Sequence, residues 1–351
     1  MLQDHRDRPG GSGPKTLPGA DATGDGWGMD QKVTPAVEAL VDAVATATRA
    51  PSMHNTQPWR FRVSPEAIEV HVDPERVLPV ADPTWRAARL ACGAALFNLR
   101  LALAVQGWSP VVTLMPDHRV ATLVARLTFE HARPASPEER ALFEAIPRRR
   151  SNRYPFLDTP IPLEHRARLR DAAARESAWL DFLLGPAAIS MISELAHAAD
   201  RQLNRNPDYR AEIAGWTRYD GEPCTDGVPE AAGGPVPQPY ELLPRRDFGS
   251  REPSRRDYET EPLIGVLGSL SDLPVDQLMA GQALQRVLLT ATHHGLVASL
   301  ISQPIEVAEI REQLRIGLGR YGPPQILLRI GYGTPGVSAP RRPASEVVEF
   351  V

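Results

Sequence analysis

The spacing of hydrophobic residues predicts a chain in which helices and strands alternate. Apolar positions recur at helical spacing after Thr34, the expected N-cap, and continue to about Thr48. Residues 59–63 and 67–72 alternate in polarity as a pair of strands does, and the long apolar run at 91–106 predicts a buried helix. The pattern therefore predicts a helix, a strand pair and a second helix in that order.

The same two periodicities continue towards the C-terminal end. Helices are predicted at 137–145, 163–178, 186–203, 275–294 and 306–316, and strands at 111–115, 120–128, 179–184, 263–267, 297–302 and 325–332. Together these elements predict the α+β class, with mostly antiparallel sheets flanked by helices.

Two stretches lack this periodicity. Residues 1–28 contain seven glycines and three prolines with few apolar residues, which predicts a disordered tail and leaves open whether Met1 or Met29 is the true start. Residues from about 204 to 262 are rich in proline and glycine but carry scattered aromatic side chains. A segment of this length is typical of a functional lid or a disordered insertion, and its aromatic residues favour an ordered lid.

An internal repeat relates two of the predicted helices. Residues 93–107 align with residues 281–295 at a constant offset, with five identities in fifteen positions: Gly93 with Gly281, Ala95 with Ala283, Leu96 with Leu284, Leu101 with Leu289 and Gly107 with Gly295. Two unrelated buried helices could share this many residues by chance, but duplication is the favoured explanation. A duplicated chain is expected to form a pseudo-dimer in which the two long helices pack together, because fusion preserves the isologous interface of a homodimer.

Composition narrows the class of protein. The 351 residues, 42% hydrophobic and 23% charged, are typical of a soluble globular protein of about two domains, and charged residues interrupt even the longest apolar stretch, so no membrane span is expected. The net charge of −4 predicts no general attraction to nucleic acid. Cys92 and Cys224 are too few for a disulfide framework and no secretion signal is visible, so a cytoplasmic protein is expected.

Some apparent motifs do not fit their structural context. Two G-x-G-x-x-G sequences begin at Gly317 and Gly331, but prolines follow both of them, so neither can open the helix that a dinucleotide-binding fingerprint requires. The adjacent His293 and His294 point to different faces of a helix, and the histidines show no spacing typical of a zinc site. We therefore expect no metal site.

Three separated motifs carry the candidate chemistry: APSMHNTQPWRF at 50–61, RRRSNRYPF at 148–156 and PRRP at 340–343. Together they resemble the FMN-dependent nitroreductase superfamily, most closely its double-length Acg-like branch, over roughly residues 34–348. The arginines also make physical sense, because a flavin mononucleotide carries a phosphate that guanidinium groups and hydroxyls bind well.

The resemblance implies a nitroreductase-like fold in tandem, with a first half at 29–146 and a second half at 147–351 that contains the lid insertion. In the ordinary homodimers of the family, the arginine segment and the C-terminal arginine belong to one subunit and the Pro-Ser-x-x-Asn segment to the other. Here each half carries only one of these contributions, which predicts one flavin site per chain.

The resemblance also implies roles for individual residues. It directs Arg149, Ser151 and Arg341 to the phosphate, with Arg150 and Arg342 in the same basic cradle. Arg153 matches the cation that faces the N1/O2 edge of the flavin ring and raises its reduction potential. The remaining residues implied at the flavin are Ser52, Met53, Asn55, Gln57, Ser299, Leu300 and Ile301. His54 is only a weak candidate for a catalytic acid, because hydride transfer at flavin N5 needs no side-chain base.

These residues support three hypotheses. The first is an FMN-dependent oxidoreductase that passes hydride from NAD(P)H or another donor to a small electrophile such as a nitroaromatic or a quinone. The second is an FMN-binding or storage protein in which a lid aromatic, Trp216, Tyr219 or Tyr240, blocks the donor site. The third is a flavin-free structural relative. Small molecules are the expected partners, and the fused halves predict a monomer that needs no further subunit to complete its site.

Overall fold

A computed structural model describes residues 35–219, 221, 223–249 and 252–351 of the chain. The described residues belong to one compact unit. The predicted tail at 1–28, the alternative start at Met29 and the N-cap at Thr34 lie outside the described residues. Helix α1 spans Val37–Ala47.

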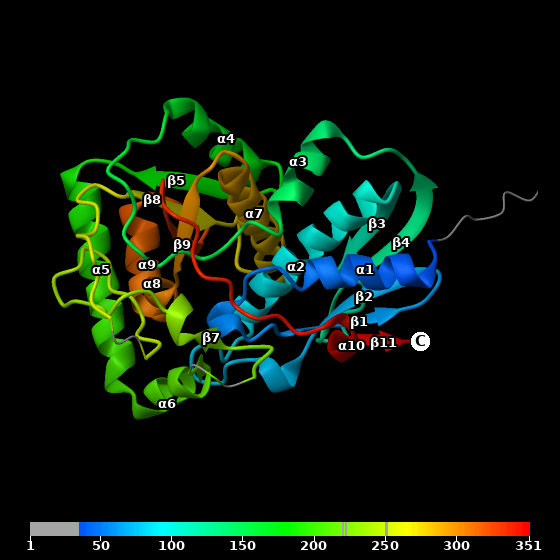
Figure 1. Ribbon diagram of the computed structural model, residues 1–351, viewed down its shortest axis with the longest axis horizontal. Coiled ribbons are helices and arrows are strands. Elements are labelled where there is room, and N and C mark those ends of the chain that lie inside the picture. The colour runs from blue at the N-terminus through cyan, green and yellow to red at the C-terminus, as the bar shows by residue number, and fades with distance from the viewer. Residues whose placement is uncertain (1–34, 220, 222, 250–251) are drawn as a thin grey trace, which may run out of the picture. The chain divides into compact units, whose positions relative to one another are not determined.

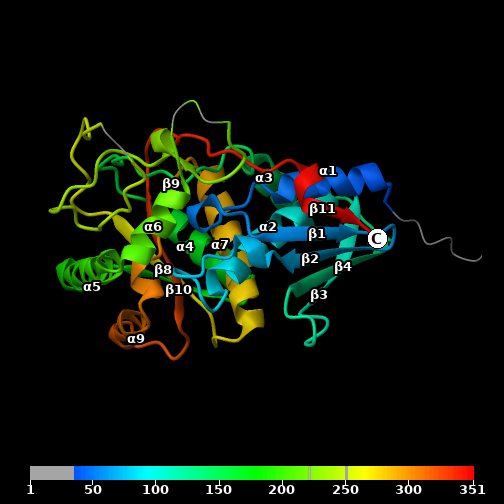
Figure 2. The same ribbon diagram turned by 90° about the horizontal axis from the view of Figure 1, so that it is seen from below.

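The first sheet has five strands in the order β11-β1-β2-β4-β3 (Figures 1 and 2). Pairing is antiparallel except between β1 and β11, where the C-terminal end of the chain runs parallel to β1. Residues alternate between buried and more exposed along β1 and β2 because helices cover only one face. The elements are β1 (Trp59–Val63), β2 (Ala67–Val72), β3 (Trp108–Leu114), β4 (Leu123–Ala132), β11 (Val348–Phe350), α2 (Arg86–Val105), α3 (Pro137–Ala145) and α10 (Ala344–Val347).

The second sheet has four antiparallel strands in the order β5-β8-β10-β9. Its central strands β8 and β10 are buried at every position, because separate apolar clusters cover the two faces of the sheet. The elements are β5 (Trp179–Leu183), β8 (Leu263–Gly268), β9 (Val297–Ile301), β10 (Pro324–Gly331), α4 (Leu163–Ala174), α5 (Pro186–Arg205), α7 (Pro274–His293), α8 (Gln303–Glu306) and α9 (Ala308–Gly317).

The two halves share one topology. The order α1-β1-β2-α2-β3-β4 in the first half is repeated as α4-β5-β8-α7-β9-β10 in the second, and equivalent strands occupy equivalent places in the two sheets. This agreement over six elements extends the short sequence repeat and confirms the predicted tandem duplication with mostly antiparallel sheets.

Helices α2 and α7 cross at the paired glycines of the repeat. A Cβ atom on Gly93 would lie 2.2 Å from the carbonyl oxygen of Leu278, and one on Gly281 would lie 2.1 Å from that of Leu90. The contacts are reciprocal, because the sequence offset that relates Gly93 to Gly281 also relates Leu90 to Leu278. The helices therefore pack as predicted, with the isologous geometry of a fused homodimer.

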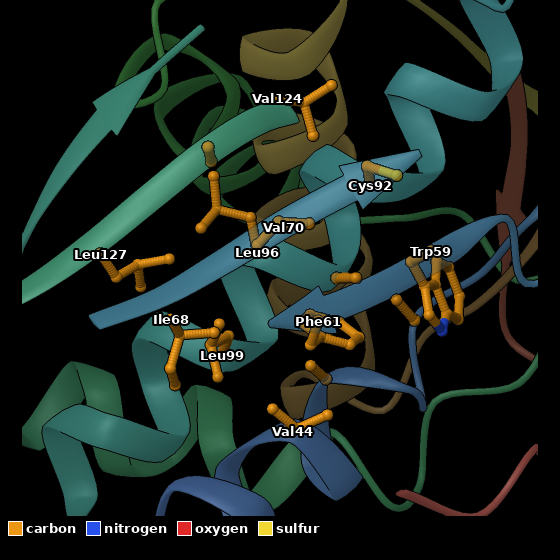
Figure 3. Packing of buried hydrophobic residues seen from close by; sticks show 14 of the residues in the cluster. Val44, Trp59, Phe61, Ile68, Val70, Cys92, Leu96, Leu99, Val124 and Leu127 are labelled. Carbon is orange, nitrogen blue, oxygen red and sulfur yellow. The ribbon is translucent and has the colours of Figure 1, made fainter. Parts of the chain in front are cut away.

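The core of the first half lies between its sheet and helices α1 and α2. Figure 3 shows Trp59 and Phe61 of β1 in one cluster with Leu96 and Leu99 of α2 and Val44 of α1. Helix α2 is long and apolar enough by composition to cross a membrane, but 83% of its most apolar window is buried inside the protein, as expected of a core helix. It is the one such helix among the described residues.

The structure differs from the sequence prediction in two segments. The stretch predicted as irregular after residue 204 contains α6 (Pro207–Gly215) and the short strands β6 (Thr217–Arg218) and β7 (Val228–Pro229). The side chain of Asn206 caps α6, and Tyr209 and Ile213 are its buried residues, too few for a clear amphipathic pattern. The C-terminal tail adds β11, whose few residues gain order only by pairing with the edge of the first sheet.

Candidate functional site

The loop between α1 and β1 has an unusual backbone. His54, Asn55 and Gln57 all adopt positive φ angles of 50° to 56°, which non-glycine residues rarely do. The hydroxyl of Ser52 accepts a hydrogen bond from the backbone N–H of Gln57 at 2.9 Å and helps to hold this conformation. Clustered strain of this kind is typical of functional sites, where surrounding contacts enforce it.

The arginine segment after α3 approaches this loop from the second half. Ser151 forms a parallel bridge to Ala298 of β9, and the backbone N–H of Asn152 donates to the carbonyl of Ala298 at 2.8 Å. The Asn152 amide also donates to the carbonyl of Thr334 at 2.7 Å. These contacts fix the segment between β9 and the C-terminal tail.

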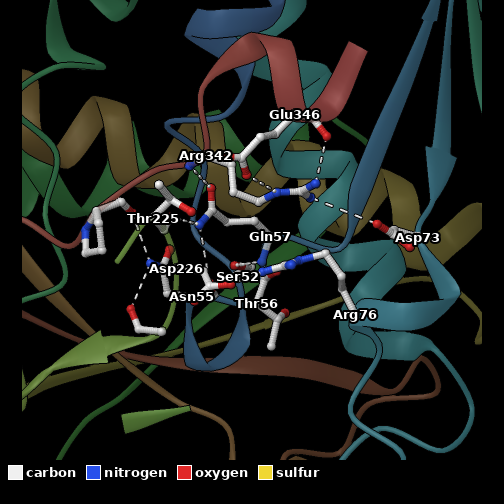
Figure 4. Close-up of polar contacts among 12 residues, drawn as sticks. Ser52, Asn55, Thr56, Gln57, Asp73, Arg76, Thr225, Asp226, Arg342 and Glu346 are labelled. Atoms are coloured by element: carbon white, nitrogen blue, oxygen red, sulfur yellow. Dashed lines mark hydrogen bonds and ion pairs between the residues drawn. The ribbon is translucent and has the colours of Figure 1, made fainter. Parts of the chain in front are cut away.

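The C-terminal tail closes the site from a third side. A guanidinium nitrogen of Arg341 donates to Oδ1 of Asn55 at 2.9 Å, and Nδ2 of Asn55 donates to the carbonyl of Pro340 at 3.0 Å. The side-chain carbonyl of Gln57 accepts from the backbone N–H of Arg342 at 2.9 Å (Figure 4). Residues separated by almost the whole chain therefore form one connected site.

These three segments enclose a strongly basic pocket, which we call the anion pocket. Its volume is about 630 Å³, including its open mouth. No aspartate or glutamate is among the described residues that line it. The polar side chains at its wall are Arg49, Ser52, Asn55, Arg149, Arg150, Ser151, Arg153, Ser338 and Arg341.

No carboxylate among the described residues lines the anion pocket beside its guanidinium groups. Burial, with Arg341 and Arg150 nearby, lowers the pKa of Arg149 to about 9, and burial together with Arg150 and Arg49 lowers that of Arg341 to about 10. The buried Nε atoms of Arg149 and Arg341 also have no hydrogen-bond partner. Buried cations of this kind are costly when unpaired, and a bound anion would offset that cost.

A second cavity adjoins the anion pocket, and we call it the inner chamber. Its volume is about 670 Å³, including its open mouth. Pro51, Ser52, Ser151 and Arg153 line both cavities, so the two lie side by side. Apolar side chains contribute much of the wall of the inner chamber, namely Met53, Leu90, Leu284, Leu300, Ile326 and Phe248.

The segment predicted as a lid packs against the α1–β1 loop. Gly227 exchanges hydrogen bonds with Asn55, since its N–H donates to the Asn55 carbonyl at 3.3 Å and its own carbonyl accepts from Nδ2 of Asn55 at 2.8 Å. The side-chain amide of Gln57 donates to the carbonyl of Thr225 at 2.8 Å. One guanidinium nitrogen of Arg153 donates to the carbonyl of Ala232 at 2.8 Å.

The three aromatic residues considered as blocking groups do not line the inner chamber. Tyr240 is 82% exposed and Tyr219 is 47% exposed, while Trp216 lies beside the guanidinium of Arg76, and none of the three lines the inner chamber. Phe248 of the same segment lines it instead, with its ring 5.6 Å from that of His54. Sequence could not distinguish these aromatics because the segment has no periodicity to show which of them point inward.

The structure gathers most of the residues that the resemblance implied. Four of them do not line either cavity. Gln57 is buried beneath the loop, Ser299 and Ile301 face a separate cavity next to Tyr258, and Arg342 pairs with Glu346. Those that line the anion pocket or the inner chamber are Ser52, Met53, His54, Asn55, Arg149, Arg150, Ser151, Arg153, Leu300 and Arg341.

Sequence reasoning missed several lining residues. Arg49 stands two residues before Pro51 of the Pro-Ser-x-x-Asn motif, so its proximity was the available signal. Three further residues line the inner chamber although no local pattern marks them: Arg86 at the start of α2, Arg246 in the segment predicted as a lid, and Ser302 directly after β9.

No group of three potential metal-ligating side chains occurs in the part of the chain that the structure describes. Cys92 is a core thiol whose pKa is raised by burial.

Comparison with known proteins places the fold and site in a family. No family model matches the sequence. A Mycobacterium tuberculosis protein provisionally named NAD(P)H nitroreductase is 34% identical over 340 residues, which cover 90% of this chain and 92% of the relative. Acg of the same organism, with the same provisional name, is 28% identical over 324 residues, or 88% of this chain and 95% of Acg. A solved structure of a provisionally named nitroreductase from Anabaena variabilis covers 86% of this chain and 90% of that one at 12% identity, with a TM-score of 0.47.

The likeness to the first relative extends over nearly the whole of both chains. The chain therefore belongs to the nitroreductase superfamily, among its double-length Acg-like proteins.

Proposed function

We propose that the protein is an FMN-dependent oxidoreductase of the nitroreductase type, which accepts hydride from NAD(P)H and delivers it to a small electrophilic acceptor. The observation that carries this proposal is a basic pocket, with no aspartate or glutamate among the described residues that line it, beside a chamber lined by both apolar and polar side chains. FMN has the matching shape and charge, with a doubly ionisable phosphate at one end and a flat apolar ring at the other. The provisional names of the relatives, which include NAD(P)H, agree with this choice.

Each part of the site has a role in this proposal. Arg149, Arg150 and Arg341 would hold the phosphate, together with the hydroxyl of Ser151. Arg153 lines both cavities and would place its charge at the edge of the ring, where it stabilises the reduced form. Bound FMN supplies the hydride chemistry. The residues of the chain bind and orient it, and the site needs no second subunit.

Removal of one buried guanidinium tests the cofactor assignment. Arg149→Ala is expected to weaken FMN binding by about 10- to 100-fold, because a hydrogen bond to a charged group is worth about 1.5–3 kcal/mol. Arg148→Ala is the matched control, since Arg148 is exposed and lines neither cavity. Fluorescence titration of the flavin-free protein with FMN gives both affinities. Equal losses in the two variants would contradict the assignment of the phosphate site.

The lid contacts favour a second candidate function, an FMN-binding or storage protein with little turnover. The lid is held to the body by a buried ion pair between Arg246 and Glu306, and Arg246 also donates to the hydroxyls of Tyr209 at 2.9 Å and Ser302 at 2.9 Å. Phe248 meanwhile occupies part of the chamber wall. A lid anchored in this way would restrict access of a donor to the flavin.

Anaerobic reduction distinguishes the two functions. Bleaching of bound flavin by NADPH, as complete as bleaching by dithionite, is the result expected of the oxidoreductase. Bleaching by dithionite alone would favour the storage protein for that donor. A purified protein that shows no flavin spectrum, even after addition of FMN, would exclude both.

A further inference from the structure

The inner chamber contains polar groups that the anion pocket does not share. Arg86, Arg246, Ser302 and His54 line the chamber and none of them lines the anion pocket. The charge of Arg246 is balanced by Glu306. Arg86 takes part in no ion pair found among the described residues, and neither ring nitrogen of His54 has a hydrogen-bond partner.

Arg86 is a buried cation in an unfavourable position. It is the first residue of α2, where the helix dipole favours negative charge, and it is only 7% exposed. One guanidinium nitrogen donates to the backbone carbonyl and the side-chain carbonyl of Gln325, at 2.8 and 3.3 Å. Burial is the main cause that lowers its pKa, to about 10. None of the ion pairs found among the described residues includes Arg86.

Asp82, Glu306 and Asp272 partly offset the charge of Arg86, but Asp82 is already engaged by backbone groups. The two carboxylate oxygens of Asp82 accept hydrogen bonds from the backbone N–H groups of Ala87 and Ala88, at 2.9 and 2.8 Å. Asp82 thus caps the first turn of α2 and does not line the inner chamber. No aspartate or glutamate is found among the residues described at the chamber wall.

His54 supplies an independent sign of a polar ligand. Its ring is 4% exposed and lines the chamber, yet neither ring nitrogen has a hydrogen-bond partner. Burial, with smaller contributions from Arg246 and Arg153, lowers its pKa well below the usual value. The neutral ring can donate from one nitrogen and accept at the other. A buried histidine without partners is costly unless a ligand completes its bonds.

We propose that the inner chamber holds a subsite for an anionic acceptor, a planar organic acid whose carboxylate binds Arg86. This proposal rests on the proposed function, because the acceptor is the substrate of the same flavin site. The guanidinium of Arg86 supplies the charge, and His54 donates a hydrogen bond to a polar substituent. Leu90, Leu284 and Phe248 provide apolar walls for the body of the acid.

Ligand binding to the flavin-loaded protein tests the subsite. Benzoate is the probe and benzamide, a neutral molecule of nearly the same shape, is its comparison. We expect benzoate to bind at least about tenfold more tightly by calorimetry, because a charge-assisted hydrogen bond distinguishes the two. Arg86→Gln is expected to reduce the affinity for benzoate to that for benzamide and to leave the FMN absorption spectrum unchanged.

The matched control is Arg89→Gln on the same helix. The side chain of Arg89 donates to the carbonyl of Thr84 and to Oε1 of Gln277, both at 2.9 Å, and does not line the chamber. This variant is expected to keep the preference for benzoate. In steady-state assays, the native protein should also favour 4-nitrobenzoate over 4-nitrobenzamide in kcat/KM, and Arg86→Gln should remove that preference.

The outcomes separate this inference from the proposed function. Equal affinities for benzoate and benzamide in the native protein, with FMN bound, would overturn the subsite and leave the flavin assignment intact. The subsite would also be overturned if Arg86→Gln raised the KM for NADPH and left the affinity for benzoate unchanged. Arg86 would then bind the anionic donor and not an anionic acceptor. A protein without FMN absorbance would instead contradict the proposed function.

Discussion

At the scale of single residues, the site is built from groups that the fold alone leaves unsatisfied. Arg149 and Arg341 have buried nitrogens without partners, and both ring nitrogens of His54 are in the same condition. Native proteins pair most buried polar groups, so such exceptions indicate positions shaped by a ligand. The sequence motifs identified these three residues, but only the structure shows that they are unpaired.

The burial of His54 predicts a pH dependence of stability. Its pKa in the folded protein lies well below 6.5, so as pH falls the unfolded chain takes up the proton first and the free energy of unfolding decreases. Between pH 7.5 and 5.5 we expect this loss of stability to be smaller in His54→Gln, by at most about 1.4 kcal/mol. Urea unfolding of the flavin-free protein at constant salt measures it. The exposed His118→Gln should retain the native slope, and identical slopes in all three proteins would refute the argument.

At the scale of elements, the contact between α2 and α7 holds the halves together and carries walls of the inner chamber. Their closest approach needs glycine on both helices, since each Cβ would meet the carbonyl of the partner helix. Backbone atoms cannot turn aside as a flexible side chain can, so any added atom separates the helices. The repeat therefore reflects a packing requirement as well as common origin.

Substitution at this crossing tests the requirement. Gly93→Ala is expected to lower the free energy of unfolding by about 1–3 kcal/mol, the usual range for overpacking. Gly215→Ala in α6 is the control, because no atom lies within 4 Å of its added Cβ, and it should be neutral or slightly stabilising. Thermal unfolding of both variants gives the comparison. A Gly93→Ala protein as stable as the native one would show that the helices can separate without cost.

At the scale of the whole molecule, the duplication has left the two halves unequal. Between α1 and β1 the first half carries the loop 48–58, which supplies Ser52 and Asn55 to the anion pocket. The equivalent connection in the second half, from α4 to β5, is only the turn 175–178. The second half therefore lacks the segment needed to build an equivalent site.

This asymmetry predicts one FMN per chain. Calorimetric titration of the flavin-free protein should give a stoichiometry of one, at a concentration of chains fixed by absorbance. A homodimer with two symmetric sites would bind two FMN molecules per pair of subunits. The fused pair of units in this chain is expected to bind one. A value of two here would contradict the loss of the second site.

The sequence by itself determined the local elements and the chemical character of the site. Helix α3 begins at Pro137 and ends at Ala145 as predicted, because Ser136 and Glu139 form a capping box within the segment itself. The strand pair 59–63 and 67–72 is likewise confirmed, since its alternation is a local pattern. The arginine motifs indicated an anion before any geometry was known.

Only the tertiary structure decided which residues share a cavity. Arg86 lies far in sequence from Arg246 and Phe248, yet all three line the inner chamber. The fold also excludes Gln57 and Arg342 from the cavity walls by giving them other partners. The short strand β11 has no local pattern of its own and forms because an edge of the first sheet is available to it. Periodicity records how each segment is buried, whereas the partner of a buried group is set by long-range contacts that one sequence does not display.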